Sequence, residues 1–391
     1  MVISKILTST GGKWLNGKWV KSAVETVTDT ISKSPVAKES IASKTLINFK
    51  TKPLTTDVLE IGTKTSTIDI VKSFGLKSTP RGFVFELSPE IEQQILADYG
   101  HSITAQRMIN RLRNPLTPKD VKNIETLLSK SSEITNITEI SPYRIVNLYK
   151  IMKINYGKDI DKLLADLTPD KATIILNGAR CQNISEAQLE AISRYKNAGI
   201  INEVVGKVGI SQSQQDEINL ISSYIKSQKL PTSTTVYRME GYMPTTTGGY
   251  DFGCLDTTKL QGEYRGLSIA QVMDRINRIK DPKLKQAEYL KLRKYITSPE
   301  NECIAQNNKF MSTFLVDKLE PQANTMIWEL NVPKGTEAAF LEGVVQNNSA
   351  AHELELLLQK DSTLKIKDII YESKTNAWKI IADVDNKGGS L

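Results

Sequence analysis

Apolar residues recur at three- and four-residue spacing between about residues 85 and 205, which predicts helices with one buried face. Several of these stretches begin with a hydroxyl residue followed by proline, a pair that suits the N-cap and first position of a helix. The pairs are Ser88-Pro89, Thr117-Pro118, Ser141-Pro142 and Thr168-Pro169, and Ser185 with Gln188 forms a capping box. We predict an all-helical binding or positioning domain over residues 80–205, packed as a plain bundle. A degenerate helical repeat would explain the same spacing.

After Gly206 the pattern changes to short runs of alternating apolar and polar residues, which predict strands. A helix at about 215–227 comes first, and a glycine- and threonine-rich insertion at about 240–305 ends in helices over 268–297, broken at Asp281-Pro282. We expect 338–341 to pair with 326–332 across the turn at Pro333. The strands are predicted at 234–239, 309–315, 326–332, 338–341, 364–371 and 378–384. The fold class is therefore α+β, a helical domain followed by a sheet domain over 206–391.

The stretch from His352 to Leu358 carries two carboxylates on an otherwise apolar strand. In extended backbone alternate side chains share a face, so Glu353 and Glu355 are expected to lie side by side. Such a pair repels itself unless a cation, or a substrate that develops positive charge, lies close by. The simpler interpretation is a surface strand with its polar face outward, so the motif alone decides nothing.

Composition and charge exclude several classes of function. The net charge is +7, but the first fifty residues hold eight Lys against three acidic residues, so the rest of the chain is close to neutral and indicates no nucleic-acid partner. Three scattered cysteines and two histidines predict neither a structural metal site nor a disulfide framework, and favour a reducing compartment. No stretch approaches the roughly 20 apolar residues of a transmembrane helix.

Residues 1–50 are rich in Ser, Thr and Lys and predict a flexible basic leader. An export signal for a bacterial effector has the same composition, as do many tails without that role. Trp14 and Trp19 are unusual in a flexible tail and are compatible with a docking segment. The apolar residues among the first ten are interrupted by polar ones, so a standard secretory signal peptide is not predicted.

Three motifs stand in a fixed order: Tyr237-Arg238 at a strand end, Phe310-Met311-Ser312-Thr313 on a later strand, and Glu353-x-Glu355 before an apolar run. This arrangement resembles the Arg–Ser–Glu class of mono-ADP-ribosyltransferases, which includes actin-modifying binary toxins, clostridial Rho-modifying exoenzymes and injected bacterial effectors. The flanks are similar too, with the helix before Arg238 and the strand and turn at 330–335. The resemblance covers about residues 205–385 and implies a mixed α/β-sandwich ADP-ribosyltransferase domain.

The resemblance implies that NAD is the substrate and gives roles to three residues. Glu355 is expected to hydrogen-bond the ribose and stabilise the positive charge that develops when nicotinamide leaves. Arg238 is expected to hold the NAD phosphates, for which its guanidinium fork is well suited. Ser312 is expected to orient Glu355. No metal is apparent, and this mechanism needs none.

Four further residues receive expected roles from the same resemblance. Glu353 is expected to hold the acceptor or accept its proton, and a glutamate at this place goes with arginine acceptors in the family. Thr313 supports the serine strand, and Tyr237 and Phe310 are candidates to line the nicotinamide pocket beside Trp328. Strand aromatics are nevertheless more often core residues.

Two features depart from the family's pattern. Phe314 replaces the second serine of the serine motif, which puts the fine positioning of nicotinamide and the acceptor type in doubt. The insertion at about 240–305 is long and would serve as a lid, a docking element or a surface elaboration. Transfer to threonine, asparagine or water, and a non-catalytic interaction module, stay open as alternatives.

The resemblance also implies where the protein acts. We expect a toxin or effector that modifies an unidentified target protein in a host cell, after secretion by a route that reads no standard signal peptide. A protein that stays in the cytoplasm of its own cell is the alternative.

Overall fold

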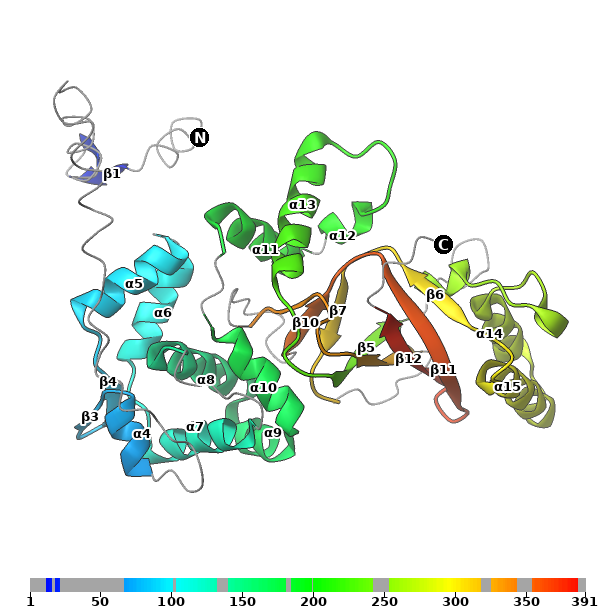
Figure 1. Ribbon diagram of the computed structural model, residues 1–391, viewed down its shortest axis with the longest axis horizontal. Helices are drawn as coiled ribbons and strands as arrows, with labels where there is room; N and C mark the ends of the chain where they lie inside the picture. Colours follow the sequence, from blue (N-terminus) through cyan, green and yellow to red (C-terminus); the bar gives the residue numbers. More distant parts are fainter. Residues whose placement is uncertain are drawn as a thin grey trace. The chain divides into compact units, whose positions relative to one another are not determined.

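The chain divides into two compact units, Met1–Glu60 and Ile61–Leu391. In the first unit β1 (Gly12–Leu15) and β2 (Lys18–Lys21) form an antiparallel hairpin whose register pairs Trp14 with Trp19 (Figure 1). The rest of the predicted leader lies outside the described residues. The structure is a computed structural model that describes residues 12–15, 18–21, 67–100, 103–131, 140–180, 184–198, 200–241, 253–317, 325–342 and 354–385.

The helical part of the second unit confirms the starts predicted from the hydroxyl–proline pairs. Ser88, Thr117, Ser141 and Thr168 all occupy N-cap positions with proline in the first turn. A small hairpin of β3 (Leu76–Thr79) and β4 (Gly82–Phe85), which the sequence pattern did not predict, lies among the helices. The helices are α4 (Thr67–Ser73), α5 (Pro89–Tyr99), α6 (Ile103–Arg113), α7 (Pro118–Lys130), α8 (Pro142–Tyr156), α9 (Ile160–Asp166) and α10 (Pro169–Gly178).

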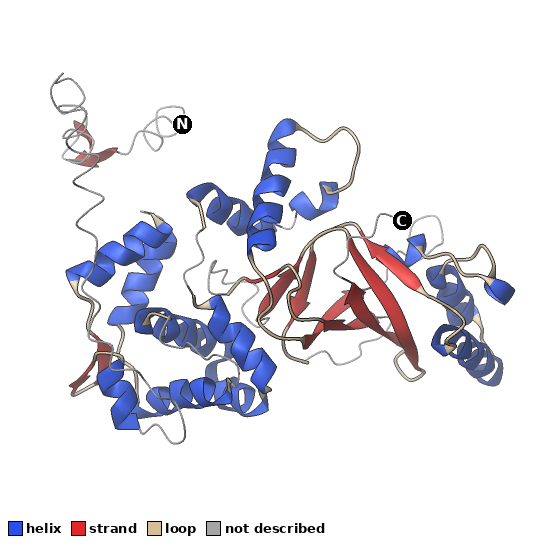
Figure 2. Ribbon diagram, in the orientation of Figure 1, coloured by secondary structure: helices blue, strands red, loops and turns tan. Residues whose placement is uncertain are grey.

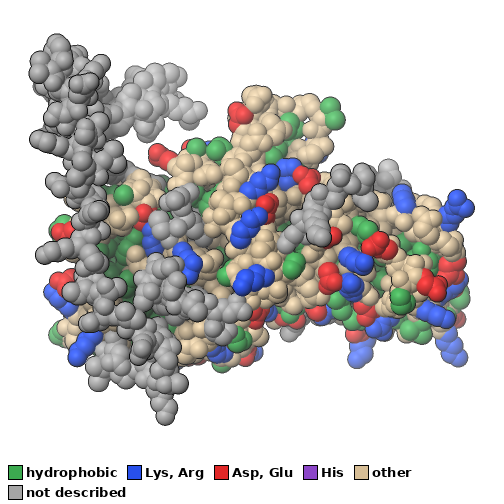
Figure 3. All heavy atoms as spheres, viewed as in Figure 1, with side chains coloured by type: hydrophobic (Ala, Val, Ile, Leu, Met, Phe, Trp, Pro, Cys, Tyr) green, Lys and Arg blue, Asp and Glu red, His purple; other side chains and the backbone are tan. Residues whose placement is uncertain are grey.

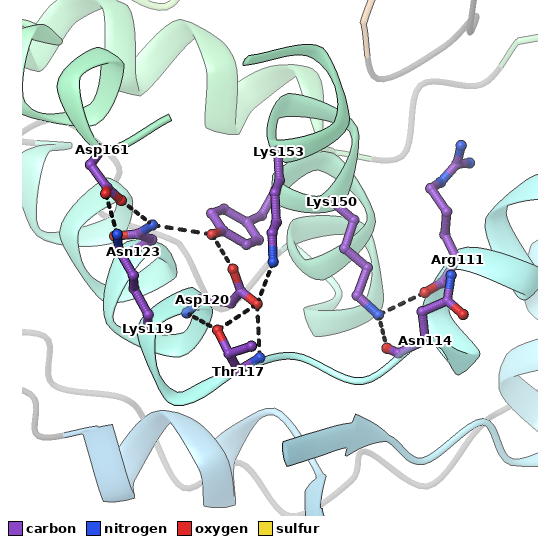
Figure 4. A network of polar contacts seen from close by, with 10 residues as sticks. Arg111, Asn114, Thr117, Lys119, Asp120, Asn123, Lys150, Lys153 and Asp161 are labelled. Atoms are coloured by element: carbon purple, nitrogen blue, oxygen red, sulfur yellow. Dashed lines mark hydrogen bonds and ion pairs between the residues drawn. The ribbon is translucent and has the colours of Figure 1, made fainter. Parts of the chain in front are cut away.

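Two polar networks join these helices (Figure 4). The buried carboxylate of Asp120 accepts hydrogen bonds from the Tyr149 hydroxyl at 2.7 Å and the Lys153 ammonium at 2.8 Å, which ties α7 to α8. The buried Lys150 ammonium donates to the carbonyl of Arg111 at 2.6 Å and to that of Asn114. Lys150 therefore places a positive charge on carbonyl groups at the C-terminal end of α6.

Three more helices lead into the sheet: α11 (Glu186–Ala198), α12 (Ile200–Val204) and α13 (Gln212–Ser227). The predicted helix at 215–227 begins earlier, at Gln212, because Ser211 and Gln214 form a capping box. The predicted boundary at residue 206 lies inside the second unit, and α10, which precedes this boundary, contacts strand β9, which follows it. The division into a helical and a catalytic domain stays a prediction.

The sheet has eight strands in the order β6-β11-β12-β8-β5-β7-β10-β9 (Figures 1 and 2). Strands β8 and β12 run parallel, and the other paired strands of this sheet run antiparallel. This mixed sheet, preceded by helices, confirms the predicted fold class. The strands are β5 (Thr234–Gly241), β6 (Ile304–Asn307), β7 (Met311–Phe314), β8 (Thr325–Val332), β9 (Ala338–Phe340), β10 (Glu355–Leu358), β11 (Ser362–Glu372) and β12 (Ala377–Asp385).

The predicted pairing of 338–341 with 326–332 is wrong. Strand β9 pairs with β10 instead, at the edge of the sheet. The turn after β8 binds the segment before β5. The Gly335 amide donates to the Leu230 carbonyl at 2.9 Å, and the Leu230 amide donates to the Thr336 carbonyl at 3.0 Å. These bonds carry the chain away from β8, and β9, which is buried along its whole length, packs on the equally buried β10.

The insertion is anchored to the sheet. It contains two short 3-10 turns, η3 (Gly253–Thr257) and η4 (Gly262–Tyr264), and the helices α14 (Ile269–Arg278) and α15 (Pro282–Thr297), which break at Asp281-Pro282 as predicted. The Arg293 guanidinium forms a two-pronged ion pair with Asp368 of β11, at 2.8 and 2.7 Å. The Trp378 indole also donates to Asn277, at 2.9 Å. These contacts favour a supporting role for α14 and α15 over that of a lid.

The surface and helix lengths bear on possible partners. Acidic and basic side chains are interspersed over the described part of the face seen in Figure 3, without one large basic patch. No helix within the described ranges has both the length and the apolar character needed to cross a membrane.

Candidate active site

Strand β5 carries Arg238 to the place where the sheet splits. It pairs with β8 along its whole length but with β7 at a single position, Tyr237 opposite Phe314. The Arg238 Nη1 donates across this split to the carbonyl of Ser312, at 2.9 Å. Its Nε donates to Glu240 at 2.6 Å. Burial acts to lower the pKa of Arg238, but the Glu240 carboxylate outweighs it, so the pKa is raised and the guanidinium stays charged.

Glu240 was not predicted as a site residue. It lies two positions after Arg238, and alternate residues of a strand share a face. Its second carboxylate oxygen accepts from the indole of the fully buried Trp328, at 3.3 Å. Glu240 therefore links Arg238 to the core, and the Arg-x-Glu spacing on a predicted strand was the signal that could have revealed it.

Glu355 begins strand β10 and is only 3% exposed. Ser312 lies on the neighbouring strand β7, opposite Leu357 of β10. Burial raises the pKa of Glu355 and Glu342 raises it further, whereas Lys196, Ser312 and the Arg238 charge act in the opposite direction. The structure thus brings together Arg238, Ser312 and Glu355 from three neighbouring strands, as the sequence motifs predicted.

The geometry expected of the Glu-x-Glu stretch is different from that observed. Leu354 has a φ of 40°, so the backbone just before Glu355 is left-handed rather than extended. Regular alternation is therefore interrupted just before Glu355, and the predicted shared face of the two glutamates stays a prediction. Glu353 itself lies outside the described residues. Glu355 is also buried, which contradicts the simpler interpretation of a polar face turned outward.

Thr313 and Phe310 support the serine strand from within. The Thr313 side chain is fully buried and its hydroxyl donates to the Leu356 carbonyl at 2.7 Å, which ties β7 to β10. The Phe310 amide donates to the Asn202 side chain at 3.0 Å, and its carbonyl accepts from the same side chain at 2.9 Å. Its ring meets Tyr195 edge to face, with centroids 6.0 Å apart. These contacts fix the strand that carries Ser312.

Tyr237 lies apart from these residues. It alternates with Arg238 along β5 and therefore points to the opposite face of the strand. There the Lys171 ammonium lies 5.1 Å from its ring centre. Tyr237 also lines a different hollow, together with Ile327 and Trp378.

A cleft of about 540 Å³ opens beside Arg238. This volume is typical of sites for small molecules and cofactors. Arg238, Glu240 and Phe310 are among the residues that line it. Cys254 also lines it, and burial raises the pKa of this thiol, so it is a weak nucleophile. Within the described part of the chain, no cluster of three His, Cys, Asp or Glu side chains could hold a metal ion.

Two buried charged residues next to Glu355 were missed by the sequence analysis. Lys196 on α11 lies 2.8 Å from Glu342 and 3.8 Å from Glu355, measured from its Nζ to the carboxylate oxygens. The sequence predicts only a binding or positioning role for its helix. The available signal was spacing, because Lys196 lies four residues after the fully buried Ile192 and therefore on the apolar side of α11.

Comparison with known proteins places this site in a family. A family model described as ADP-ribosyltransferase exoenzyme matches residues 177–387, which is more than half of the chain. The match includes Arg238, Ser312 and Glu355, and it begins early enough to include Lys196. A search of curated proteins found no match.

Solved structures give a weaker likeness. Plx2a, an ADP-ribosyltransferase toxin from Paenibacillus larvae, is 20% identical over 52% of this chain and 87% of its own, with a TM-score of 0.36. C3stau2 from S. aureus, solved with NAD, is 20% identical over 53% of this chain and 90% of its own, with a TM-score of 0.35. The enzymatic component C2-I of the Clostridium botulinum C2 toxin is 22% identical over 52% of this chain and 44% of its own, with a TM-score of 0.34.

Proposed function

This chain belongs to the ADP-ribosyltransferase exoenzyme family, and we propose that it transfers ADP-ribose from NAD to an arginine side chain of a target protein, as a toxin or effector. Family membership supports NAD-dependent transfer of ADP-ribose and a toxin-like character. The residue roles, the arginine acceptor and the action in a host cell are our proposal.

One observation supports the residue roles most directly: Arg238, Ser312 and Glu355 come from three neighbouring strands, and Arg238 binds the Ser312 carbonyl across the split in the sheet. Ser312 and Arg238 both act to lower the pKa of Glu355. Among the described residues, Arg238 uses its Nε and Nη1 groups on Glu240 and the Ser312 carbonyl. A guanidinium has five N–H donors, so others are available for the phosphates of NAD.

The reaction balances with these groups. The bond between the ribose C1′ and the nicotinamide nitrogen breaks, and its electron pair leaves with nicotinamide. The ribose carbon becomes oxocarbenium-like, and the Glu355 carboxylate stabilises the positive charge that exists only at that stage. A guanidine nitrogen of the acceptor then bonds to C1′ and gives up a proton, for which Glu353 is the proposed acceptor.

The arginine acceptor rests on the Glu353-x-Glu355 motif and the family pattern that the sequence resembles. Asparagine, threonine and water are alternative acceptors that leave the role of Glu355 unchanged. A non-catalytic module is disfavoured, because a binding surface has no need for a buried carboxylate on a strand next to those that carry a serine and a charged arginine.

We further propose that the target lies in a host cell and that residues 1–50 act in export. The helical domain over 80–205 would position the target or the catalytic domain. The composition of the leader and the toxin-like family support this proposal.

The test is incubation of the purified protein with labelled NAD and a eukaryotic lysate, followed by mass spectrometry of labelled bands. Glu353→Gln is the informative variant, because it keeps Glu355 intact. We expect it to release nicotinamide at the wild-type rate while labelling far less arginine. Labelling of asparagine or threonine by the wild type, or undiminished arginine labelling by Glu353→Gln, would contradict the proposed acceptor.

A further inference from the structure

Three charged side chains are buried together in a cluster that includes Glu355 of the candidate active site. Glu342, Glu355 and Lys196 are all almost fully inaccessible, with side-chain exposures of 3%, 5% and 2%. They come from distant parts of the chain, since Lys196 lies on α11, Glu342 follows β9 and Glu355 begins β10. The Lys196 ammonium binds Glu342 at 2.8 Å and lies 3.8 Å from Glu355.

In this cluster one ammonium group interacts with two carboxylates. Two buried carboxylates that share a site repel each other, and the repulsion favours protonation of one of them. A buried ammonium between them offsets that effect. The proposed chemistry needs Glu355 as an anion, because a neutral carboxyl group stabilises a developing positive charge poorly. Some group must therefore keep a carboxylate that is 3% exposed in its charged form, and Lys196 is the cation placed to do so.

We propose that Lys196 is a positioning residue that keeps Glu355 ionised and oriented for catalysis, with Glu342 holding the ammonium in place. This inference deepens the proposed function and rests on it.

The other groups around Glu355 do not replace Lys196. Ser312 carries no charge, and Arg238 acts on Glu355 from β5, where its guanidinium is already paired with Glu240. Tyr195, the neighbour of Lys196 on α11, is buried, and burial raises its pKa beyond the range in which the phenol ionises. Lys196 therefore supplies the cation closest to Glu355 among the charged groups described around it.

The same cluster reaches into the helical part of the unit. The Asn155 side chain on α8 donates to Glu342 at 3.4 Å, on the side away from Lys196. The polar contacts thus run from α8 through Glu342 and Lys196 to Glu355. This gives the helical part a direct structural link to the charge state of the candidate catalytic carboxylate.

Two substitutions with opposite expected signs test the proposal. Lys196→Met removes the cation and leaves two carboxylates together, so the acidic limb of the pH profile of nicotinamide release should move upward by about one pH unit or more. At pH values below the acidic limbs of both proteins, Lys196→Met should therefore release nicotinamide about tenfold or more slowly than wild type. Glu342→Gln removes the repelling carboxylate and leaves Lys196 to Glu355, so the limb should move downward. Lys196→Arg keeps the charge and should restore most of the wild-type profile.

Lys150→Met is the matched control, because it also removes a buried lysine, one that binds carbonyl groups of the helical part. It should lower the melting temperature without moving the limb. Unmoved limbs in both Lys196→Met and Glu342→Gln, or a shift of the same sign in both, would overturn the proposal. If Lys196→Met does not fold, Glu342→Gln alone tests the proposal. A downward shift of its acidic limb supports the proposal, and an unmoved or raised limb overturns it.

A second readout separates this proposal from the proposed function. The carboxyl carbon of Glu355, assigned by its loss in Glu355→Gln, can be titrated by NMR in wild type, Lys196→Met and Glu342→Gln. One result to distinguish is a titration of Glu355 that shifts in opposite directions in the two variants while the wild type releases no nicotinamide. That result would overturn the catalytic role of Glu355 and leave the electrostatic role of Lys196 in place. Nicotinamide release with unshifted titrations would overturn the role of Lys196 alone.

Discussion

Ser312→Ala removes the serine hydroxyl, which acts as a hydrogen-bond donor to lower the pKa of the Glu355 carboxylate. A hydrogen bond to a charged group contributes about 1.5–3 kcal/mol, and one pKa unit corresponds to about 1.4 kcal/mol. A donor to the ionised carboxylate favours the charged form, so its loss raises the pKa of Glu355. Below the acidic limb the rate of nicotinamide release should therefore fall about 10- to 100-fold, with recovery as the pH rises.

The assay is nicotinamide release measured across the acidic pH range at saturating NAD. The KM for NAD should change little, because Arg238 binds the backbone carbonyl of Ser312, which the substitution retains. Ser222→Ala is the matched control, since it removes another largely buried serine hydroxyl, one bonded to Gln359 at 3.2 Å. It should cost about 1 kcal/mol of stability and leave the limb in place. An equal loss of rate in both variants, independent of pH, would refute the assigned role of Ser312.

Three other substitutions test separate parts of the account. Arg238→Lys loses the fork that joins Glu240 and the Ser312 carbonyl, so the KM for NAD should rise about tenfold or more; an unchanged KM in steady-state kinetics would remove Arg238 from NAD binding. Gly178→Ala places a Cβ 2.4 Å from the Phe340 ring, and this overpacking should cost about 1–3 kcal/mol in urea unfolding; full stability would mean that α10 does not press on β9 as described. Burial raises the pKa of Glu355, so the native state binds its proton more tightly than the unfolded chain and stability falls as pH rises through that raised pKa. Glu355→Gln should remove this dependence of stability on pH and melt at a higher temperature than wild type near pH 7. A lower melting temperature of the variant at that pH would contradict this prediction.

Local patterns in the sequence predicted much of the architecture. The hydroxyl–proline pairs fix helix starts because capping depends on residues next to one another in the chain. The alternation of buried and more exposed residues along strands β11 and β12 is equally local. The pairing partner of β9 depends instead on contacts distant in sequence, such as those between Leu230 and the turn at Gly335, and local patterns carry no information about them.

In the candidate site, too, local motifs predicted some features, and contacts distant in sequence determine the others. The motifs predicted Arg238, Ser312 and Glu355 by type and order, and the structure brings them together. The left-handed conformation of Leu354 could not be predicted, because leucine has no preference for it. Lys196 was missed because a single lysine on a helix usually reaches solvent, and its burial depends on two carboxylates from elsewhere in the chain.

The most direct test of the central claim is nicotinamide release from NAD by the purified protein, beside Glu355→Gln and the control Ser222→Ala, with folding checked by circular dichroism. The account predicts release by the wild type and by Ser222→Ala, and a loss of at least about a hundredfold in Glu355→Gln. Equal release by wild type and Glu355→Gln, or none by a folded wild type, would contradict the assignment of Glu355 as the carboxylate that drives NAD cleavage.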